Sequence, residues 1–363
     1  MTELELKKAL GQEIEIPDQV EECIRQACAQ ARPASKKARR SRRPLRTALA
    51  AAAAVAVLGA SAAAVYAVNH GSAFQLFFGD ETRPSTEYTE WYDEHGNLRV
   101  GSLNEERVPV DEEQAETLVG EYLEDTGYVW QVGEYTLTVE SYLLDENTGT
   151  GKVAYSLYHP GGLEDIIVDE YTNEVFLTEG GIGIANFSVR VDGEWRLMGE
   201  DTYADRSRST EDTLYMTTAL CGTLGGGAWN AADGLRIEFR DFRLDVEIED
   251  YYSLVKKMEL PGLESLPAVT VNDPDTGEEA ARLSAIGMML RTPEIALVDY
   301  VALEYADGTR YVIKDDENNL RNTDYAMGNG ERPNMEVRYC FNRLVDPEQV
   351  VAVTVNETTY TIK

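Results

Sequence analysis

The chain has 363 residues, in which 65 Asp and Glu oppose 33 Lys and Arg and give a formal net charge of -32 at pH 7. This acidic balance argues against a nucleic-acid-binding protein, because such binding begins with the neutralisation of phosphates. Four cysteines in a chain of this length predict no disulfide framework.

The first 46 residues are predicted to form two short helices with a basic juxtamembrane run. Thr2 and Glu5 match a capping box for the first helix. The second helix begins near Pro17 and Asp18, and its apolar residues recur at spacings of three and four, which places them on one face. The predicted partner-binding residues on this face are Val20, Cys23, Ile24, Ala27 and Cys28. A weakly ordered tail is the alternative, since short helices have little stability of their own.

A run of 33 residues without a formal charge extends over 47–79, directly after eight Lys and Arg in 32–46. We predict a transmembrane helix at 47–68, because 22 residues of helix span about 33 Å and the hydrocarbon core is about 30 Å thick. The lipid bilayer is therefore an expected partner. The positive-inside rule places the N-terminus in the cytoplasm and the C-terminal part outside. The topology signal is Arg39, Arg40, Arg42, Arg43 and Arg46.

Two alternatives to this anchor remain open. One is a cleaved signal sequence, for which Val65-Tyr66-Ala67 supplies a small-residue cleavage pattern, although 46 residues precede the apolar run and a signal peptide has a short lead. The other is a buried helix of a soluble protein, for which so long an uncharged stretch is unusual.

Residues 69–127 are predicted to form a polar juxtamembrane segment and a short helix. Asp111 is placed to cap this helix, and we expect the helix to end at Gly127. The apolar positions that define its buried face are Ala115, Leu118, Val119, Tyr122 and Leu123.

From residue 128 onward the apolar period changes from 3.6 to 2, which predicts strands. A first β-domain is expected over 128–260 and a second, immunoglobulin-like one over 261–363, with a connector at 251–260. Short, regularly spaced strands favour antiparallel β-sandwiches, so the predicted class is mainly β outside the membrane. The expected strands are 135–140, 153–158, 184–191, 195–198, 213–220, 235–246, 282–290, 301–305, 311–314, 335–342 and 351–362.

No residue pattern predicts catalysis, a cofactor or a firm metal site. Any His-dependent catalysis outside the juxtamembrane segment would depend on His159, which precedes Pro160 in a turn. The glycines near 180 and 225 lack the context of a phosphate-binding loop. Two weak candidates for a cation site are the pair Asp145 and Asn147 and the group Asp273, Asp275 and Glu278. Solvated turns are the simpler interpretation of both.

The cysteines divide into Cys23 and Cys28 before the predicted anchor and Cys221 and Cys340 after it. A bridge between Cys221 and Cys340 is possible in an oxidising compartment. Their expected positions in different domains count against it.

Four stretches together carry a family resemblance: KKALGQEIEIPDQVEECIRQA, RRPLRTALAAAAAVAVLGASAAA, YTLTVESYLLDENTGTGKVAYSLYHPGGL and LVDPEQVVAVTVNETTYTIK. The chain resembles membrane-anchored, anti-sigma-factor-like proteins of Gram-positive bacteria, which carry an uncharacterised extracellular domain followed by an immunoglobulin-like module. The resemblance implies a single-pass regulator whose inner helices hold a cytoplasmic sigma factor. The His and Cys cluster of zinc-type anti-sigma domains is absent from this sequence, so sigma binding would depend on packing alone.

The resulting hypothesis is a membrane regulator without enzymatic activity that couples extracellular β-domains to a cytoplasmic partner. The alternative is a cell-envelope adhesive or ligand-binding protein whose inner segment only sets the topology. An outer hydrolase is a third and weaker alternative, because no pair of carboxylates stands out among the 65 acidic residues.

Overall fold

The computed structural model describes residues 73–79, 90–92, 98–100, 105–106, 108–163, 166–168, 175–177, 185–239, 256–331 and 334–362. The chain divides into the units Met1–Asn69 and His70–Lys363, and every described residue belongs to the second. The predicted helix pair and the predicted membrane span at 47–68 lie outside the described residues. Among those described, no helix is long and apolar enough to cross a bilayer.

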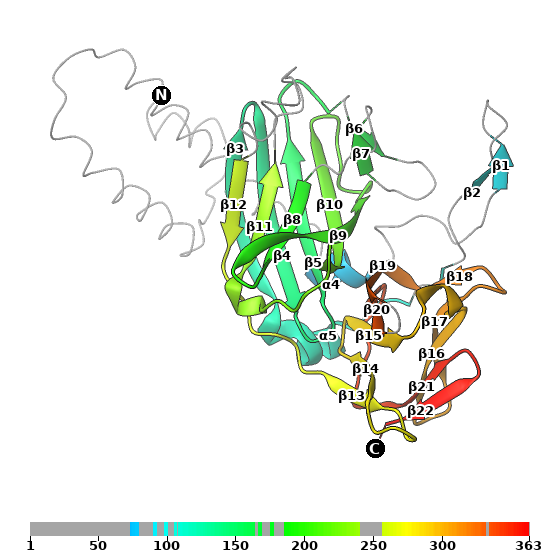
Figure 1. Ribbon diagram of the computed structural model, residues 1–363. Coiled ribbons are helices and arrows are strands. Elements are labelled where there is room, and N and C mark those ends of the chain that lie inside the picture. Colours follow the sequence, from blue (N-terminus) through cyan, green and yellow to red (C-terminus); the bar gives the residue numbers. More distant parts are fainter. Residues whose placement is uncertain are drawn as a thin grey trace, which may run out of the picture. The chain divides into compact units, whose positions relative to one another are not determined.

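The described part of the chain is mainly β and antiparallel, as the sequence predicted, with few helices (Figure 1). Its larger sheets contain eight, five and five strands. Two small ribbons accompany them, one formed by β1 (Glu90–Tyr92) with β2 (Leu98–Val100) and the other by β6 (Ile166–Val168) with β7 (Val175–Leu177).

The eight-stranded sheet has the order β12-β11-β8-β9-β10-β5-β4-β3. Its strands are β3 (Glu124–Val132), β4 (Tyr135–Asp145), β5 (Thr150–Tyr158), β8 (Ala185–Val191), β9 (Glu194–Ala204), β10 (Thr213–Thr223), β11 (Leu235–Phe239) and β12 (Lys256–Leu260).

This sheet bends within β9. The first residues of β9 pair with β8, whereas residues from Met198 onward pair with β10. The two halves then face one another across a single core, where the rings of Tyr155 and Phe187 lie 5.8 Å apart and those of Tyr135 and Phe239 also lie 5.8 Å apart. The two halves of one continuous hydrogen-bonded sheet therefore build this core. The period of a strand does not reveal that its two halves have different neighbours, so the sequence could not show the bend.

Two five-stranded sheets follow and share a second core. The first has the order β13-β14-β15-β20-β19 and contains β13 (Val269–Asn272), β14 (Glu279–Leu283), β15 (Gly287–Thr292), β19 (Thr323–Glu331) and β20 (Asn334–Phe341). The second has the order β18-β17-β16-β21-β22 and contains β16 (Tyr300–Tyr305), β17 (Arg310–Asp315), β18 (Leu320–Arg321), β21 (Val350–Val355) and β22 (Thr358–Thr361).

Two short helices precede the sheets. Helix α5 (Glu112–Val119) has the predicted cap, since the Asp111 carboxylate accepts the N–H groups of Glu113 at 3.0 Å and Gln114 at 3.2 Å. It ends earlier than predicted, in the 3-10 turn η2 (Gly120–Tyr122), because β3 begins at Glu124 and pairs with β4. Helix α4 (Ala73–Phe78) was not predicted. Five of its six residues are buried, which corrects the expectation of a wholly polar juxtamembrane segment.

Two hairpins follow the sequence prediction, β4–β5 and β8–β9. The β8–β9 turn contains Asp192 at φ 53° and Gly193 at φ 82°, the positive values that a type I′ turn requires. The predicted connector at 251–260 is partly wrong, because Lys256–Leu260 forms β12 and pairs with β11. The single strand expected at 282–290 is instead the end of β14 and most of β15, joined by a turn at 284–286.

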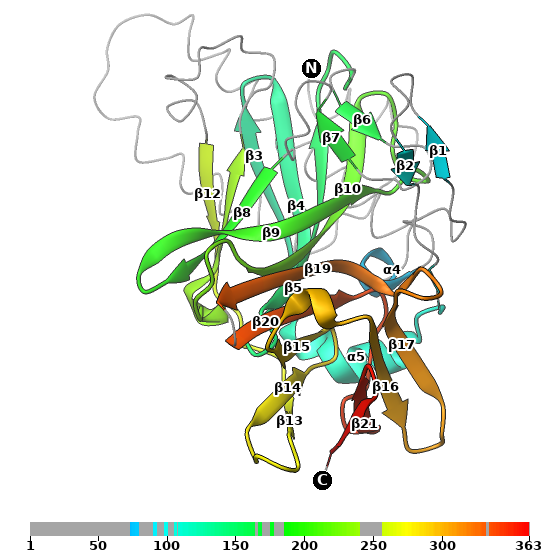
Figure 2. The same cartoon turned by 45° about the vertical axis from the view of Figure 1, so that its right-hand side comes forward.

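Strands β19 and β20 lie against the eight-stranded sheet. Figure 2 shows them passing beside β5 and β9, with α4 close by. The sheet face that meets them is the one opposite the large core, so β5 is buried on both faces. We call this contact region, where α4, the eight-stranded sheet and β19–β20 meet, the joint.

Candidate functional site

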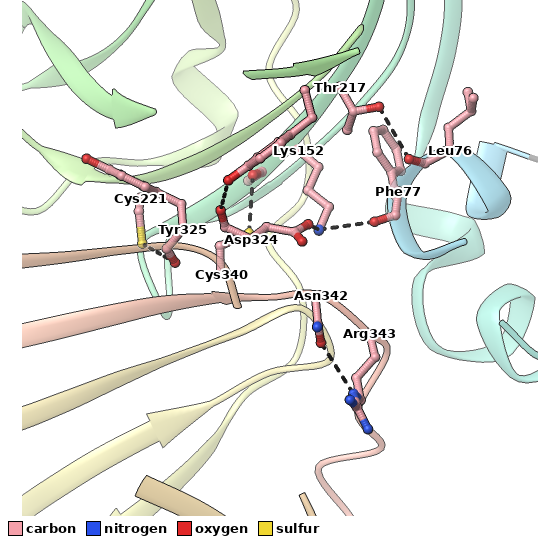
Figure 3. A network of polar contacts seen from close by, with 12 residues as sticks. Leu76, Phe77, Lys152, Thr217, Cys221, Asp324, Tyr325, Cys340, Asn342 and Arg343 are labelled. Atoms are coloured by element: carbon pink, nitrogen blue, oxygen red, sulfur yellow. Dashed lines mark hydrogen bonds and ion pairs between the residues drawn. The ribbon is translucent and has the colours of Figure 1, made fainter. Parts of the chain in front are cut away.

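The joint contains Lys152, the third residue of β5, whose side chain is completely buried (Figure 3). Val153, Tyr155 and Leu157 of the same strand face the large core, so Lys152 points to the opposite side of the sheet. There its ammonium group forms an ion pair with the carboxylate of Asp324 on β19, a side chain that is 7% exposed. A buried charge is tolerated only when it is paired, so this contact couples β5 to β19.

Helix α4 is attached to the same lysine. Lys152 Nζ donates to the Phe77 carbonyl at 3.2 Å and lies 4.9 Å from the ring centre of Phe78. On the neighbouring strand β10, the Thr217 hydroxyl donates to the Leu76 carbonyl at 3.3 Å. The last carbonyls of a helix have no partner inside it, and these two donors supply one to each. A six-residue helix has little stability alone, so its position depends on these contacts and on burial.

A second part of the segment before α5 is bonded to the C-terminal sheets. The backbone N–H of Glu106 donates to Asn322 Oδ1 at 2.6 Å, and Asn342 Nδ2 donates to Glu105 Oε1 at 2.7 Å. Arg343 donates to the carbonyl of Glu106. The segment that follows the predicted anchor is therefore bonded both to the eight-stranded sheet and to the C-terminal sheets.

Further hydrogen bonds cross the joint. The Tyr203 hydroxyl of β9 donates to the Asp324 carbonyl at 2.9 Å, and Asn329 Nδ2 of β19 donates to the Thr223 carbonyl of β10 at 3.0 Å. Because these bonds use backbone carbonyls, they fix where β19 lies along β9 and β10.

Close approach across the joint requires glycine at two positions. A Cβ added at Gly287 of β15 would lie 2.5 Å from Thr150 Oγ1, and one added at Gly199 of β9 would lie 2.5 Å from Met327 Sδ. Contacts this short force the neighbouring groups to move. At Gly199 the nearest atom belongs to the flexible Met327 side chain, whereas at Gly287 a backbone oxygen, that of Tyr339, also lies within 2.9 Å, so of the two glycines Gly287 tolerates a side chain less well.

The turn between β4 and β5 holds a buried carboxylate, Asp145. It accepts hydrogen bonds from the Thr148 hydroxyl, the Asn147 N–H at 2.9 Å and the Ser265 hydroxyl at 3.1 Å. Burial raises the pKa of Asp145, and these hydrogen bonds oppose that shift. Its oxygens thus accept hydrogen bonds that stabilise the β4–β5 turn and that bind Ser265 to this turn. The weak cation-site candidate at Asp145 and Asn147 is thus a hydrogen-bonded turn, and its Asp145 is buried, not solvated as the simpler interpretation expected.

The second candidate cation site is also a turn. The Asp273 carboxylate accepts the N–H groups of Asp275 at 2.8 Å and Thr276 at 2.9 Å, and these bonds lower the pKa of Asp273. In the part of the chain that the structure describes, no group of three His, Cys, Asp or Glu side chains is placed to hold a metal ion.

His159 is buried and packs on Tyr135, with ring centres 4.6 Å apart. Its Nδ1 accepts the N–H of Gly161 at 3.0 Å, and its Nε2 lies 3.6 Å from a carboxylate oxygen of Glu134. This is the environment of a histidine that shapes a turn.

Glu200 lies in the part of β9 that pairs with β10, just after the change of partner between Leu197 and Met198, and its Oε2 accepts the N–H of Phe187 at 3.2 Å. Burial raises the pKa of Glu200 to about 8; the Phe187 bond opposes the shift, and the charge of Asp201 adds to it. The carboxyl therefore keeps its proton at neutral pH in the folded protein, which makes it a pH-sensitive group at the bend of the sheet.

One hollow lies away from the joint. It has a volume of 920 Å³, and its walls are the turns at 160–163 and 209–212 with Ile166, Val168 and Arg206. A second hollow of 720 Å³ lies beside Asp273, Arg291 and Tyr360.

The residues predicted to bind a partner and to set the topology lie outside the described residues. They are Val20, Cys23, Ile24, Ala27, Cys28, Arg39, Arg40, Arg42, Arg43 and Arg46. The structure places none of them, and their roles stay predictions.

Comparisons with known proteins add little to this geometry. No protein-family model matches the chain, and no curated protein sequence matches it. A conserved domain protein from Bacillus anthracis, known from its crystal structure, is similar at 12% sequence identity with a TM-score of 0.35. That match covers 65% of this chain and 78% of the other. At this TM-score the likeness defines neither the fold nor the function.

Sequence reasoning missed the joint altogether. The one local signal is Lys152, a charged residue inside a strand whose other members are apolar or small. Nothing in the pattern indicates its partner, because Asp324 is 172 positions away and occurs in a strand, β19, that was not predicted.

Proposed function

We propose that the protein is a single-pass membrane regulator, similar to anti-sigma factors, that couples an outer β-rich region to a cytoplasmic partner. The observation that carries this proposal is the charge-free run at 47–79. It separates a segment of eleven basic and seven acidic residues, net +4, from a remainder of -36, since the whole chain has -32. An apolar run between a basic and an acidic segment is typical of a bitopic protein with its N-terminus in the cytoplasm.

The contacts of α4 support coupling between the two sides. This helix begins five residues after the predicted span ends at Val68, and Lys152 and Thr217 hold its last carbonyls. A change in the contact between β5 and β19 would act on the Lys152–Asp324 pair, and through Lys152 on the chain that enters the membrane. Such a transition needs an element with two arrangements; α4 is docked in the structure, and a released α4 would be the second state.

We further infer that β13–β22 form an immunoglobulin-like β-sandwich. Two antiparallel five-stranded sheets contribute to one core, which is the layer arrangement of that class. The bent eight-stranded sheet would act beside it as the uncharacterised outer domain.

The predicted partner-binding face of the second N-terminal helix can be tested by co-purification of a partner with the full-length protein. With the tagged protein purified from its own cells in detergent, we expect a sigma factor to be recovered with the wild type and lost with Ile24→Asp. Gln26→Asp is the matched control, because it adds the same charge on the opposite face of the predicted helix. Equal recovery with both variants would contradict the proposed face.

Two further experiments separate regulation from adhesion. Protease added to intact cells should digest the C-terminal region; a protected region that fractionates with cytosol would refute the topology. Deleting residues 1–30 should change transcription of the partner's target genes. Unchanged transcription, together with altered surface behaviour after loss of residues 124–362, would favour the adhesive or ligand-binding alternative.

A further inference from the structure

The joint brings two cysteines from distant strands into one small apolar cluster. Cys221 of β10 and Cys340 of β20 are both fully buried and share this cluster with Ala219. Tyr325 and Met327 of β19 pack against it. From the sequence we expected the two cysteines to be far apart, in separate domains. The structure instead places them in one cluster.

Each thiol contacts a backbone carbonyl on the opposite side of the joint, in a strand that pairs with the strand of the other cysteine. Cys221 Sγ lies 4.0 Å from the carbonyl of Tyr325, and Tyr325 is the register partner of Cys340. Cys340 Sγ lies 3.7 Å from the carbonyl of Gly151, which follows Thr150, the register partner of Cys221. The two side chains thus cross the same interface in opposite directions, each toward a backbone carbonyl on the far side (Figure 3).

We propose that Cys221 and Cys340 form a disulfide bond that covalently joins β10 to β20. The reaction is thiol–disulfide exchange with a disulfide-containing oxidant. One cysteine loses its proton and attacks a sulfur of the oxidant, which releases one thiol; the second cysteine then attacks the mixed disulfide and releases the other. Two protein thiols are oxidised to one disulfide, and one oxidant disulfide is reduced to two thiols.

The surroundings determine when this reaction occurs. Burial raises the pKa of the Cys221 thiol, and the neighbouring Cys340 raises it further, so the reactive thiolate is suppressed while the joint is closed. The bond forms during folding or during opening of the joint, when an oxidant can enter. Once formed, it closes a long loop, and such a loop constrains the unfolded chain strongly.

The disulfide adds a covalent connection beside the Lys152–Asp324 pair. It would prevent separation of β19–β20 from the eight-stranded sheet, and so would retain the surface on which α4 docks. This inference goes beyond the proposed function and needs only an oxidising environment, not a sigma factor.

The test uses the full chain purified in detergent and reduced beforehand. It is incubated with a mixture of reduced and oxidised glutathione in urea near the unfolding midpoint, returned to buffer, quenched with acid and alkylated. Tryptic digestion should then give the peptide 209–236 linked to the peptide 339–343. Thermal unfolding should shift upward by several degrees on oxidation, and the shift should vanish in both Cys221→Ser and Cys340→Ser.

Alkylated or glutathionylated Cys221 and Cys340 in place of the linked peptide would overturn the proposal, as would a thermal shift that survives in either serine variant. A second arm alkylates intact cells before lysis. A linked peptide there supports the bond in the cell. If the peptide forms with glutathione but is absent from cells that retain the protein, the disulfide stands and the proposed outer location fails.

Discussion

Replacing Lys152 with methionine removes the buried cation of the joint and keeps a side chain of similar length. The Asp324 carboxylate, 7% exposed, would lose the ammonium that neutralises it. Breaking a buried ion pair from one side costs about 3–5 kcal/mol. The Phe77 carbonyl loses a donor as well, at about 1 kcal/mol. We therefore expect the free energy of unfolding to fall by about 4 kcal/mol or more.

Urea unfolding of the full chain at pH 7 measures this loss, with Asp324→Asn and the double variant Lys152→Met/Asp324→Asn beside it. The double variant has no stranded charge, so its cost should be clearly smaller than the sum of the two single costs. Chymotrypsin cleavage after Phe77 or Phe78 should become faster in Lys152→Met under native conditions, because α4 loses its attachment.

A loss below about 1 kcal/mol for Lys152→Met would refute the assignment of this pair as a buried, coupled contact. So would a double variant whose cost equals the sum. If Lys152→Met loses stability as expected but chymotrypsin cleaves α4 no faster, Lys152 stabilises the contact between the sheets and does not hold α4 in place.

Three other variants test the same region. Glu200→Gln tests the pH dependence of stability. In the folded protein the pKa of Glu200 is about 8, above the ordinary value of 4.5, so unfolding releases a proton at pH values between the two. The free energy of unfolding of the wild type therefore falls by about 1.4 kcal/mol per pH unit in that range. In urea unfolding, the free energy of unfolding of Glu200→Gln relative to that of the wild type should rise between pH 5 and 7.5. A difference between the two proteins that does not change with pH would contradict the raised pKa. Thr217→Val should cost about 1 kcal/mol through the lost bond to Leu76, and should speed chymotrypsin cleavage in α4; equal cleavage would show that this bond does not hold the helix. Gly287→Ala should lower the free energy of unfolding by about 1–3 kcal/mol, because the added methyl group crowds Thr150. Adding Thr150→Ala to the same chain should recover part of that loss in thermal unfolding. No recovery would show that the strain does not arise at Thr150.

Those strands and hairpins that follow local rules could be read from the sequence. Alternating apolar residues at 135–140 and the Asp192-Gly193 pair predict a strand and a type I′ turn without reference to the rest of the chain. The same is true of the Asp111 cap, since capping involves only the next three residues. The charge asymmetry around 47–79 is also a property of the sequence alone.

Some strands were missed because their residues are poor local strand formers. β19 contains Gly328 and Gly330 and an Asp at its second position, and it forms a strand because β20 pairs with it along its length. β12 begins with two lysines and was interpreted as a connector, but pairing with β11 makes it the edge of the eight-stranded sheet.

The sequence by itself determined that this protein is antiparallel and β-rich, where many of its strands and turns lie, and that a charge-free run divides it. Only the tertiary structure decided that Lys152 meets Asp324, that α4 docks on them, and that Cys221 and Cys340 share one cluster. The physical reason is distance along the chain. Strand periods and caps arise from neighbours a few residues apart, whereas a joint arises where two sheets meet, and its partners are chosen by the packing of the whole unit.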